Sequence, residues 1–395
     1  MSDPFTHAKT ILKILEENGF KAYIVGGSVR DYLLKRPIHD IDIATSATPE
    51  QVMTIFPVTF PVGVKHGTVI VRHENCNYEV TTFRSESGYK DFRHPDEVTF
   101  ETSIFVDLAR RDFTMNAMAM AMNGQILDPY GGRADLKKGI LRTVGNAEAR
   151  FKEDPLRQLR AIRFIAQLSL KPDRVMEKAI TTCAPYIRHL AVERIREEMT
   201  KLLMQDAAPR GLELLLRTGL HTHLPGSQWL PRLECTLDVS FRWLDTEDER
   251  WALFLISSDC KNPDAFLKTW KFSNKTALAI LSLMNAFQRR NQHEWDKLTL
   301  YQYGLETACS VEKIRRAMGH AFTSQEILTE CWVELPIKSR SQLAVNGRDL
   351  CRWLDKKGGP WTGRLLEHIE NKVILGEVSN DRHAIQRWLE RHAFD

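Results

Sequence analysis

The sequence predicts an α+β protein, with an N-terminal α/β head followed by an all-α remainder. Two observations indicate this class. Apolar runs that alternate with period two occur before about residue 136, whereas apolar residues at helical spacing dominate after it. A third observation is a composition of 43% hydrophobic and 27% charged residues over 395 positions, which is typical of a folded globular chain and, at this length, of several domains.

The head is predicted to alternate short helices and strands. Apolar residues at helical spacing predict a helix over residues 4–18, which ends at Gly19. The apolar run at residues 22–25 predicts a strand that enters a Gly-Gly turn and then a helix through Leu34. Further strands are predicted at residues 40–44, 68–72 and 77–83, and the charged, Gly- and Pro-bearing stretch 85–97 predicts a mobile loop.

The remainder is predicted to be helical because Pro and Gly fall mainly between runs of helical periodicity. Neither a fixed-period repeat nor a low-complexity tract occurs in it. The predicted helices cover residues 156–168, 174–183, 192–203, 211–216 and 250–255.

The charge is unevenly distributed, although the formal net charge is only +4. Residues 1–135 carry 14 basic and 18 acidic side chains, whereas residues 136–201 carry 15 and 8. An acidic segment beside a basic one is typical of a metal-dependent site that faces a polyanion. A solvated, arginine-rich helix face would give the same numbers.

The cysteines and the hydropathy pattern bear on the compartment. Seven cysteines are scattered without a CxxC pair, which predicts reduced thiols and neither a disulfide framework nor a zinc site. No window approaches the uncharged apolar length of a membrane span, and the N-terminal residues lack a secretory pattern. We therefore expect a cytoplasmic protein that has no membrane partner.

The turn Gly26-Gly27-Ser28 lies between a predicted strand and a predicted helix, and Arg30 follows about one turn later. Glycines allow a ligand to approach the backbone closely, and a helix N-terminus with an arginine favours phosphate. Most Gly-Gly turns bind nothing, so this motif indicates a phosphate site only in combination with the motifs that follow it.

Asp40 and Asp42 belong to the next predicted strand, where positions i and i+2 face the same side. Two carboxylates on one face repel each other unless a cation lies between them. Mg²⁺ takes such oxygen ligands together with substrate phosphates, as phosphoryl transfer requires. Glu79, on a neighbouring predicted strand, is a candidate third carboxylate, although it could instead anchor the sheet by hydrogen bonding. The alternative for the Asp pair is a solvated edge strand.

Arg110 and Arg111 precede a predicted helix and suit contacts to a triphosphate or a ribose. Asp112 and Asn116 lie one helical turn apart, where they could fix the geometry of these contacts. The alternative is a capped helix start with surface arginines.

The most informative segment runs Glu-Asp-Pro-Leu-Arg-Gln-Leu-Arg-Ala-Ile-Arg-Phe from residue 153. Pro155 suits the first turn of a helix with Asp154 near its N-cap, and Arg157, Arg160 and Arg163 follow at steps of three. Aspartate accepts from an exocyclic amino group and arginine donates to a ring acceptor. An Asp154–Arg157 pair would therefore accept cytosine and adenine and reject uracil and guanine. Arg160 and Arg163 would brace this pair or hold phosphates.

These motifs, in this order, resemble those of class II tRNA nucleotidyltransferases in the polymerase-β-like nucleotidyltransferase superfamily. The chain is similar over its whole length to bacterial CCA-adding enzymes of the Bacillus type. The motifs that carry the resemblance are Gly26-Gly27-Ser28-Val29-Arg30-Asp31, Asp40-Ile41-Asp42, Arg110-Arg111-Asp112, Glu153-Asp154 with Arg157, and residues 343–350 with Gly358-Gly359-Pro360.

The resemblance implies addition of C, C and A to the tRNA 3′ end from CTP and ATP, without a nucleic-acid template and with release of pyrophosphate. It implies a catalytic head (1–135), a neck that recognises the nucleotide (136–201), and a body (202–300) and tail (301–395) that bind tRNA. It also implies Mg²⁺ at Asp40 and Asp42, and a homodimer. Nucleotide contacts are implied at Gly27, Arg30, Arg111, Asp154, Arg157, Arg160 and Arg163.

Two positions depart from the family pattern: Ser28, where Ala is common, and His94, where relatives often carry Arg in the loop that is thought to switch the pocket from C to A. The alternative function is a bacterial poly(A) polymerase, which shares the head and neck motifs. Such enzymes usually carry a longer basic C-terminal extension. A non-catalytic RNA-binding protein is disfavoured because Asp40, Asp42 and Arg111 are all present.

Overall fold

The computed structural model describes residues 4–88, 92 and 97–392. It divides into two compact units, and each is described by itself. The first unit comprises residues 1–228 with 269–271, and the second comprises residues 229–268 with 272–395.

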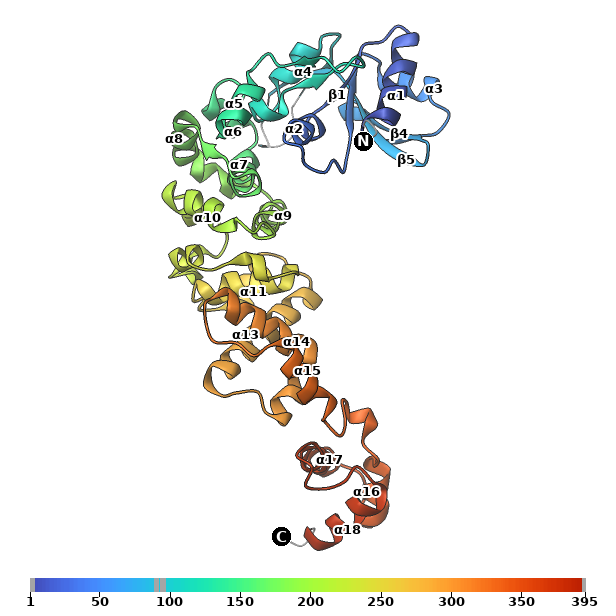
Figure 1. The fold of residues 1–395 in the computed structure, drawn as a ribbon, viewed down its shortest axis with the longest axis vertical. Coiled ribbons are helices and arrows are strands. Elements are labelled where there is room, and N and C mark those ends of the chain that lie inside the picture. Colours follow the sequence, from blue (N-terminus) through green and yellow to red (C-terminus); the bar gives the residue numbers. More distant parts are fainter. Residues whose placement is uncertain (1–3, 89–91, 93–96, 393–395) are drawn as a thin grey trace. The chain divides into compact units, whose positions relative to one another are not determined.

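The first unit begins with a mixed sheet, which has seven strands in the described part of the chain (Figure 1). Strand β2 is central: it pairs antiparallel with β1 and parallel with β5. This pairing places Asp42 opposite both Val25 and Glu79. In sheet order the strands are β3 (Thr59–Gly63), β4 (Thr68–His73), β5 (Cys76–Thr82), β2 (Asp42–Thr45), β1 (Ala22–Val25), β8 (Ala119–Met120) and β9 (Ile126–Leu127).

Short helices connect these strands, and apolar residues of helix α4 join strand residues in one core. Val25, Phe83 and Leu108, from three separate elements or their ends, are almost completely buried in it. Strands β6 (Arg84–Ser87) and β7 (Glu97–Phe100) form a separate antiparallel pair. The helices are α1 (Thr6–Glu17), α2 (Gly27–Leu33), α3 (Pro49–Ile55), α4 (Ile104–Ala109) and α5 (Gly132–Lys138).

The rest of the first unit is mostly helical. A short parallel pair, β10 (Ile140–Leu141) with β11 (Lys171–Pro172), is its sheet element within the described residues. Helix α7 packs its apolar face against α9 and α10, with Leu159 and Ile162 buried. The helices are α6 (Ala147–Glu153), α7 (Leu156–Leu168), α8 (Arg174–Cys183), α9 (Val192–Leu203) and α10 (Ala208–Arg217).

The second unit contains helices and 3₁₀ turns in its described residues. Leu350, Ile369 and Ile385 lie at the centre of one of its cores, and α14 is kinked at Gly304, where φ is 80°. Its helices are α11 (Glu247–Ser257), α12 (Pro263–Thr269, whose last residue belongs to the first unit), α13 (Asn274–Gln292), α14 (Lys297–Ala317), α15 (Gln325–Val333), α16 (Gly347–Trp353), α17 (Pro360–Ile374) and α18 (Arg382–His392).

The predicted fold class is confirmed, and the helices predicted at 156–168, 174–183 and 192–203 have the bounds of α7, α8 and α9. Each of these three helices carries apolar residues at helical spacing on its buried side, and α8 also has an N-cap, Asp173, whose side chain accepts from the Val175 nitrogen. Within the described residues, no helix has the length and apolar character needed to cross a membrane. All seven cysteines are unpaired.

Two local predictions are wrong, and a third is wrong at its ends. The second strand begins at Asp42, so Asp40 lies outside it. The reason is that β1 ends at Val25, opposite Asp42, and turns away at Gly26, which leaves no antiparallel partner for residue 40. The predicted loop 85–97 is framed by the β6–β7 pair, because its ends join through hydrogen bonds. The loop residues 89–91 and 93–96, including His94, lie outside the described residues.

The third correction concerns Arg110 and Arg111, which follow α4 and do not precede a helix. Phe113 is extended, and it forms a β-bridge with Thr143 that prevents helix formation at this point. Asn116 ends a single 3₁₀ turn, which still brings its side chain to Asp112.

Candidate active site

A cavity of about 430 Å³ in the first unit collects most of the predicted site residues. Its lining comes from the β1–α2 turn, the start of β2, the segment after α4, and helices α7 and α9. Six arginines face three aspartates, so the cavity is positively charged and suits an anion. The charged lining residues are Arg30, Arg110, Arg111, Arg157, Arg160, Arg194, Asp42, Asp112 and Asp154.

The β1–α2 turn requires a glycine at position 26. Gly26 has φ 73° and ψ −136°, a conformation that is strained for other residues. A Cβ atom there would lie 3.2 Å from Arg111 Nη1 and 3.3 Å from Asp42 Oδ2. The turn therefore places bare backbone against a guanidinium and a carboxylate.

Asp42 is half-buried at the start of β2, and negative charge gathers around it. Burial raises the pKa of Asp42 and the neighbouring Glu79 carboxylate raises it further, whereas Arg111 lowers it and Asp40 adds a smaller increase. A divalent cation would relieve this excess of negative charge. The described residues contain no group of three or more His, Cys, Asp or Glu side chains that could hold a metal ion. A bound cation would therefore need further ligands from a substrate.

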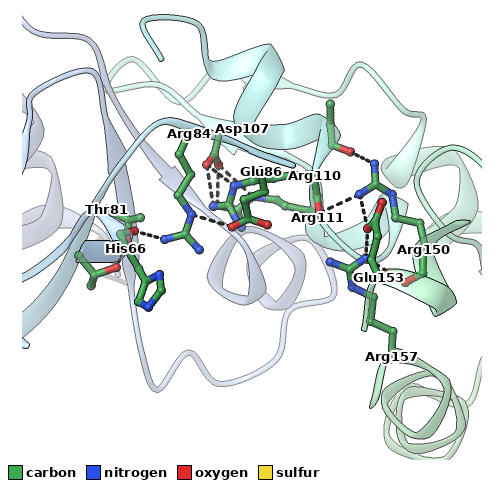
Figure 2. A network of polar contacts seen from close by, with 12 residues as sticks. His66, Thr81, Arg84, Glu86, Asp107, Arg110, Arg111, Arg150, Glu153 and Arg157 are labelled. Carbon is green, nitrogen blue, oxygen red and sulfur yellow. Dashed lines mark hydrogen bonds and ion pairs between the residues drawn. The ribbon is translucent and has the colours of Figure 1, made fainter. Parts of the chain in front are cut away.

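Arg110 and Arg111 share one buried counter-ion, Asp107, on α4 (Figure 2). Arg110 donates to Asp107 Oδ1 at 2.7 and 3.0 Å, and Arg111 donates to Oδ2 at 3.0 and 3.2 Å. Burial acts to raise the pKa of Asp107, but Arg111 and Arg110 together lower it overall. Asp107 thus orients both guanidinium groups, and Arg110 Nη1 also donates to Glu86 Oε1 at 3.0 Å.

A second carboxylate, Asp112, links the segment after α4 to helix α7. Its Oδ2 accepts from Arg160 at 2.7 and 2.9 Å, and its Oδ1 accepts from Asn116 at 3.0 Å. Asn116 Oδ1 in turn accepts from Arg30 Nη1 at 2.9 Å. Burial acts to raise the pKa of Asp112, but Arg160 and the Asn116 hydrogen bond outweigh it and lower the pKa to about 2. Asp112 is therefore ionised at neutral pH and holds Arg160 in place.

Phe164 lies beneath these arginines and lines the cavity. The guanidinium carbons of Arg30, Arg160 and Arg163 lie 5.3, 5.6 and 4.2 Å from its ring centroid. A ring face attracts cations, so Phe164 helps to hold like charges close together.

Asp154 and Arg157, the predicted base-reading pair, both line the cavity. Asp154 Oδ1 accepts from the backbone nitrogen of Leu156 at 3.0 Å, which agrees with the predicted position near the start of α7. Asp154 Oδ2 accepts from Arg194 at 2.9 Å. Arg157 Nη1 donates to Glu153 Oε2 at 2.5 Å. The acceptor and the donor are thus each held by another charged side chain.

The structure brings together seven of the ten predicted site residues: Gly27, Arg30, Asp42, Arg111, Asp154, Arg157 and Arg160. Asp40 and Glu79 are exposed and lie outside the lining, close enough to Asp42 to affect its charge. Arg163 points to Glu198 Oε2, at 2.7 Å, and does not line the cavity. Sequence reasoning missed Arg194 and Asp107. Arg194 lies 40 residues from Asp154 with no local pattern, whereas a charge inside the apolar run of α4 could have identified Asp107.

Comparison with curated proteins identifies the family. A CCA-adding enzyme from Geobacillus stearothermophilus is 46% identical over 398 aligned residues, covering 98% of this chain and 97% of the relative. The chain belongs to the CCA-adding enzymes. Another member, from Bacillus cytotoxicus, is 42% identical over 98% of both chains. These relatives favour a CCA-adding enzyme over a poly(A) polymerase.

Family models match three parts of the chain. Residues 22–142 match the poly A polymerase head domain, and residues 169–230 match the RNA- and SrmB-binding site of polymerase A. Residues 242–389 match tRNA nucleotidyltransferase domain 2. The first match contains the Gly-Gly turn, Asp42 and Arg111.

Solved structures of CCA-adding enzymes share the fold. The crystal structure of the Bacillus stearothermophilus enzyme in complex with CTP superposes with a TM-score of 0.92 at 42% identity, covering 100% of this chain and 98% of that one. A Thermotoga maritima CCA-adding enzyme complexed with tRNA has a TM-score of 0.65 at 21% identity, which shows a common fold only.

Proposed function

We propose that this chain adds C, C and A to the 3′ end of tRNA from CTP and ATP, without a nucleic-acid template and with release of pyrophosphate. The observation that carries the proposal is the placement of Asp154 and Arg157 in one arginine-rich cavity with Asp42 and Arg111. A donor–acceptor pair for the base and a cationic region for the phosphates lie within the same space, as a nucleoside triphosphate requires.

Asp42, with Asp40 as its neighbour, would hold Mg²⁺ together with oxygens of the triphosphate. The fit rests on the excess negative charge around Asp42, to which Glu79 contributes. Bound Mg²⁺ would polarise the α-phosphate and neutralise developing charge. Glu79 then acts mainly through its charge, since it lies outside the cavity lining.

The arginines of this chain bind and orient the nucleotide. Arg111 lies against Gly26, so phosphate oxygens can approach both a guanidinium and the bare backbone. Arg30 accordingly donates to Asn116 and Arg160 to Asp112, and both guanidinium groups add positive charge to the cavity lining. When the tRNA 3′ oxygen forms its bond to the α-phosphorus, the bond to the leaving pyrophosphate breaks, and these arginines would hold the charge that the pyrophosphate carries away.

Base selection would depend on hydrogen-bonding order. Asp154 accepts from the exocyclic amino group of C or A, and Arg157 donates to the ring acceptor beside it. Uracil and guanine present a carbonyl where the amino group should be, opposite a carboxylate that Arg194 and Leu156 hold in one orientation. Two bases are thus accepted with one pair of side chains.

For the tRNA, a patch on the second unit supports an interaction with RNA. The guanidinium carbons of Arg242 and Arg316 lie 4.4 and 3.5 Å from the ring centroid of Trp243, and Phe322 is 47% exposed beside Arg316. Within the described residues neither arginine is paired with a carboxylate. Arginine stacked on aromatic rings suits phosphate and base contacts. We also infer a homodimer from the family resemblance, and a cytoplasmic location from the scattered cysteines without a CxxC pair.

Incubation of the protein with tRNA that lacks its 3′ CCA, labelled CTP or ATP, and Mg²⁺ tests the function. Ordered addition of CCA is expected. Long A tails would instead indicate a poly(A) polymerase, and absence of any product would refute nucleotidyl transfer.

The RNA patch is tested separately with an Arg242→Met/Arg316→Met variant. We expect weaker tRNA binding and a salt slope smaller by about one for each phosphate group that the variant no longer neutralises. CTP binding should stay unchanged, because the substitutions lie in the second unit. An unchanged salt slope would exclude the patch as an RNA-binding surface.

A further inference from the structure

Arg150, on helix α6, holds the backbone of the Arg110–Arg111 segment. Its Nη2 donates to the carbonyl oxygen of Ala109 at 2.7 Å, and its Nη1 to that of Arg110 at 3.4 Å. Its Nε donates to the carbonyl oxygen of Val144 at 3.3 Å. The side chain is only 19% exposed, so these hydrogen bonds fix its position.

The same guanidinium also reaches the base-reading pair. Arg150 Nη1 donates to Glu153 Oε2 at 2.9 Å, and that oxygen accepts from Arg157 Nη1 at 2.5 Å. Arg157 Nη1 also donates to the carbonyl oxygen of Arg150 at 3.1 Å. Figure 2 shows Glu153 between the two arginines. A single carboxylate oxygen therefore joins Arg150 to Arg157.

The two ends of this chain of hydrogen bonds have different partners in the proposed function. At one end, Arg111 is bonded to Asp107 and faces the space assigned to the phosphates. At the other end, Arg157 faces the base. A hydrogen bond weakens steeply with angle and distance, so a shift of the Ala109–Arg111 backbone changes how Arg150 shares the oxygen of Glu153.

A second connection between the segment after α4 and helix α7 does not involve Arg157. Arg160 joins helix α7 to Asp112, and its guanidinium lies over the ring of Phe164. The Arg160–Asp112 ion pair can hold the two elements together but does not orient the base-reading arginine. Arg150, in contrast, contacts the backbone after α4 and also shares a carboxylate oxygen with Arg157.

We propose that Arg150 is a positioning residue that couples occupancy of the phosphate region by a triphosphate to the placement of Arg157 against the base. The inference rests on the proposed function and deepens it. With a triphosphate bound, Arg157 is held in its reading position; without one, it discriminates less between bases. Discrimination between C and U should therefore be stronger for triphosphates than for monophosphates.

The test measures four dissociation constants with the full chain and Mg²⁺, by competition against labelled CTP: those of CTP, UTP, CMP and UMP. Coupling is the ratio of the dissociation constants of UTP and CTP divided by the ratio of the dissociation constants of UMP and CMP. We expect about 5-fold or more in the wild type, the lower end of typical site-to-site coupling. Arg150→Met should bring the value close to one. A value near one in the wild type, or an unchanged value in Arg150→Met, would overturn the proposal.

Two further variants separate positioning from loss of structure. Glu153→Gln keeps the shape of the side chain but removes its charge, which makes the shared oxygen a weaker hydrogen-bond acceptor. This variant should therefore lower the coupling even if Arg150→Met does not fold. Arg142→Met is the matched control, because Arg142 is an arginine of the same unit that pairs with two other carboxylates, Asp135 and Asp173. An equal loss of coupling in Arg142→Met would refute a specific role for Arg150.

The outcome is distinguishable from failure of the proposed function. A chain that does not add CCA gives no product in the incorporation assay, whatever its binding constants. A chain that adds CCA normally but lacks coupling in the wild type contradicts only the role of Arg150.

Discussion

Replacing Asp154 with Asn is the sharpest test of base reading, because it keeps the shape of the side chain and changes only its donor–acceptor order. In the wild type, one oxygen accepts from the Leu156 nitrogen at 3.0 Å and the other from Arg194 at 2.9 Å. Asparagine has a single oxygen. It can serve either the start of α7 or Arg194, and its NH₂ group must face the other position or the base.

The size of the effect follows from this conflict. An amino group of C or A would meet an amide donor, and a charge-assisted hydrogen bond worth about 1.5–3 kcal/mol would be lost. The kcat/KM for CTP and ATP should then fall roughly 10- to 150-fold, at about tenfold per 1.4 kcal/mol. The carbonyl of uracil would gain a donor, so use of UTP should rise relative to CTP. Asp154→Ala removes the acceptor without adding a donor and should reduce discrimination against UTP by roughly 5- to 150-fold.

The assay is single-turnover incorporation of CTP and UTP on tRNA that lacks CCA, and of ATP on tRNA that ends in CC, together with the melting temperature. Asp173→Asn is a matched control, since Asp173 also accepts from a helix-start nitrogen, that of Val175 at 3.1 Å, and pairs with an arginine at 3.0 Å, outside the cavity. Asparagine accepts from a helix-start nitrogen about as well as aspartate does, so in both variants a loss of stability should come mainly from the weakened pairing with arginine. If Asp154→Asn lowers the melting temperature as Asp173→Asn does and leaves the CTP/UTP ratio unchanged, the base-reading role must be abandoned.

The remaining predictions concern metal binding, the loop and acid stability. Asp42→Ala should abolish incorporation of both C and A while tRNA affinity stays within about tenfold, since a metal ligand is removed and the RNA-binding surface is not; incorporation near the wild-type rate would contradict the metal assignment. Deletion of residues 89–94 should leave tRNA ending in CC as the main product, and normal completion of CCA would show that the loop does not switch the pocket. For Asp112, the pKa of about 2 lies below its ordinary value of 3.8, so the pairing with Arg160 stabilises the protein above about pH 4 and this contribution is lost as the pH falls toward 2. Asp112→Asn should therefore lower the free energy of unfolding by about 2 kcal/mol at pH 7 and reduce its fall between about pH 4 and pH 2, as measured by urea unfolding at several pH values. An unchanged fall in that pH range would refute this role of Asp112.

The sequence by itself determined the fold class and the bounds of α7, α8 and α9, because helical periodicity is a local property of the sequence. It also indicated the chemistry of the cavity. A carboxylate near a helix start with arginines at fixed steps gives a local donor–acceptor order. Asp154 and Arg157 keep that order in the structure.

Only the tertiary structure decided which charged groups meet. Asp40 lies outside β2 because strand pairing ends where β1 turns at Gly26. Arg163 faces Glu198 and not the cavity, although it continues the same row of arginines.

The side chains that hold the base-reading pair depend on contacts between residues far apart in the sequence. Arg194 reaches Asp154 from 40 residues away, and Arg150 bonds to Ala109 across 41 residues. The direction of a long side chain depends on which carboxylates and carbonyl groups packing places around it. No local pattern in the sequence records that arrangement.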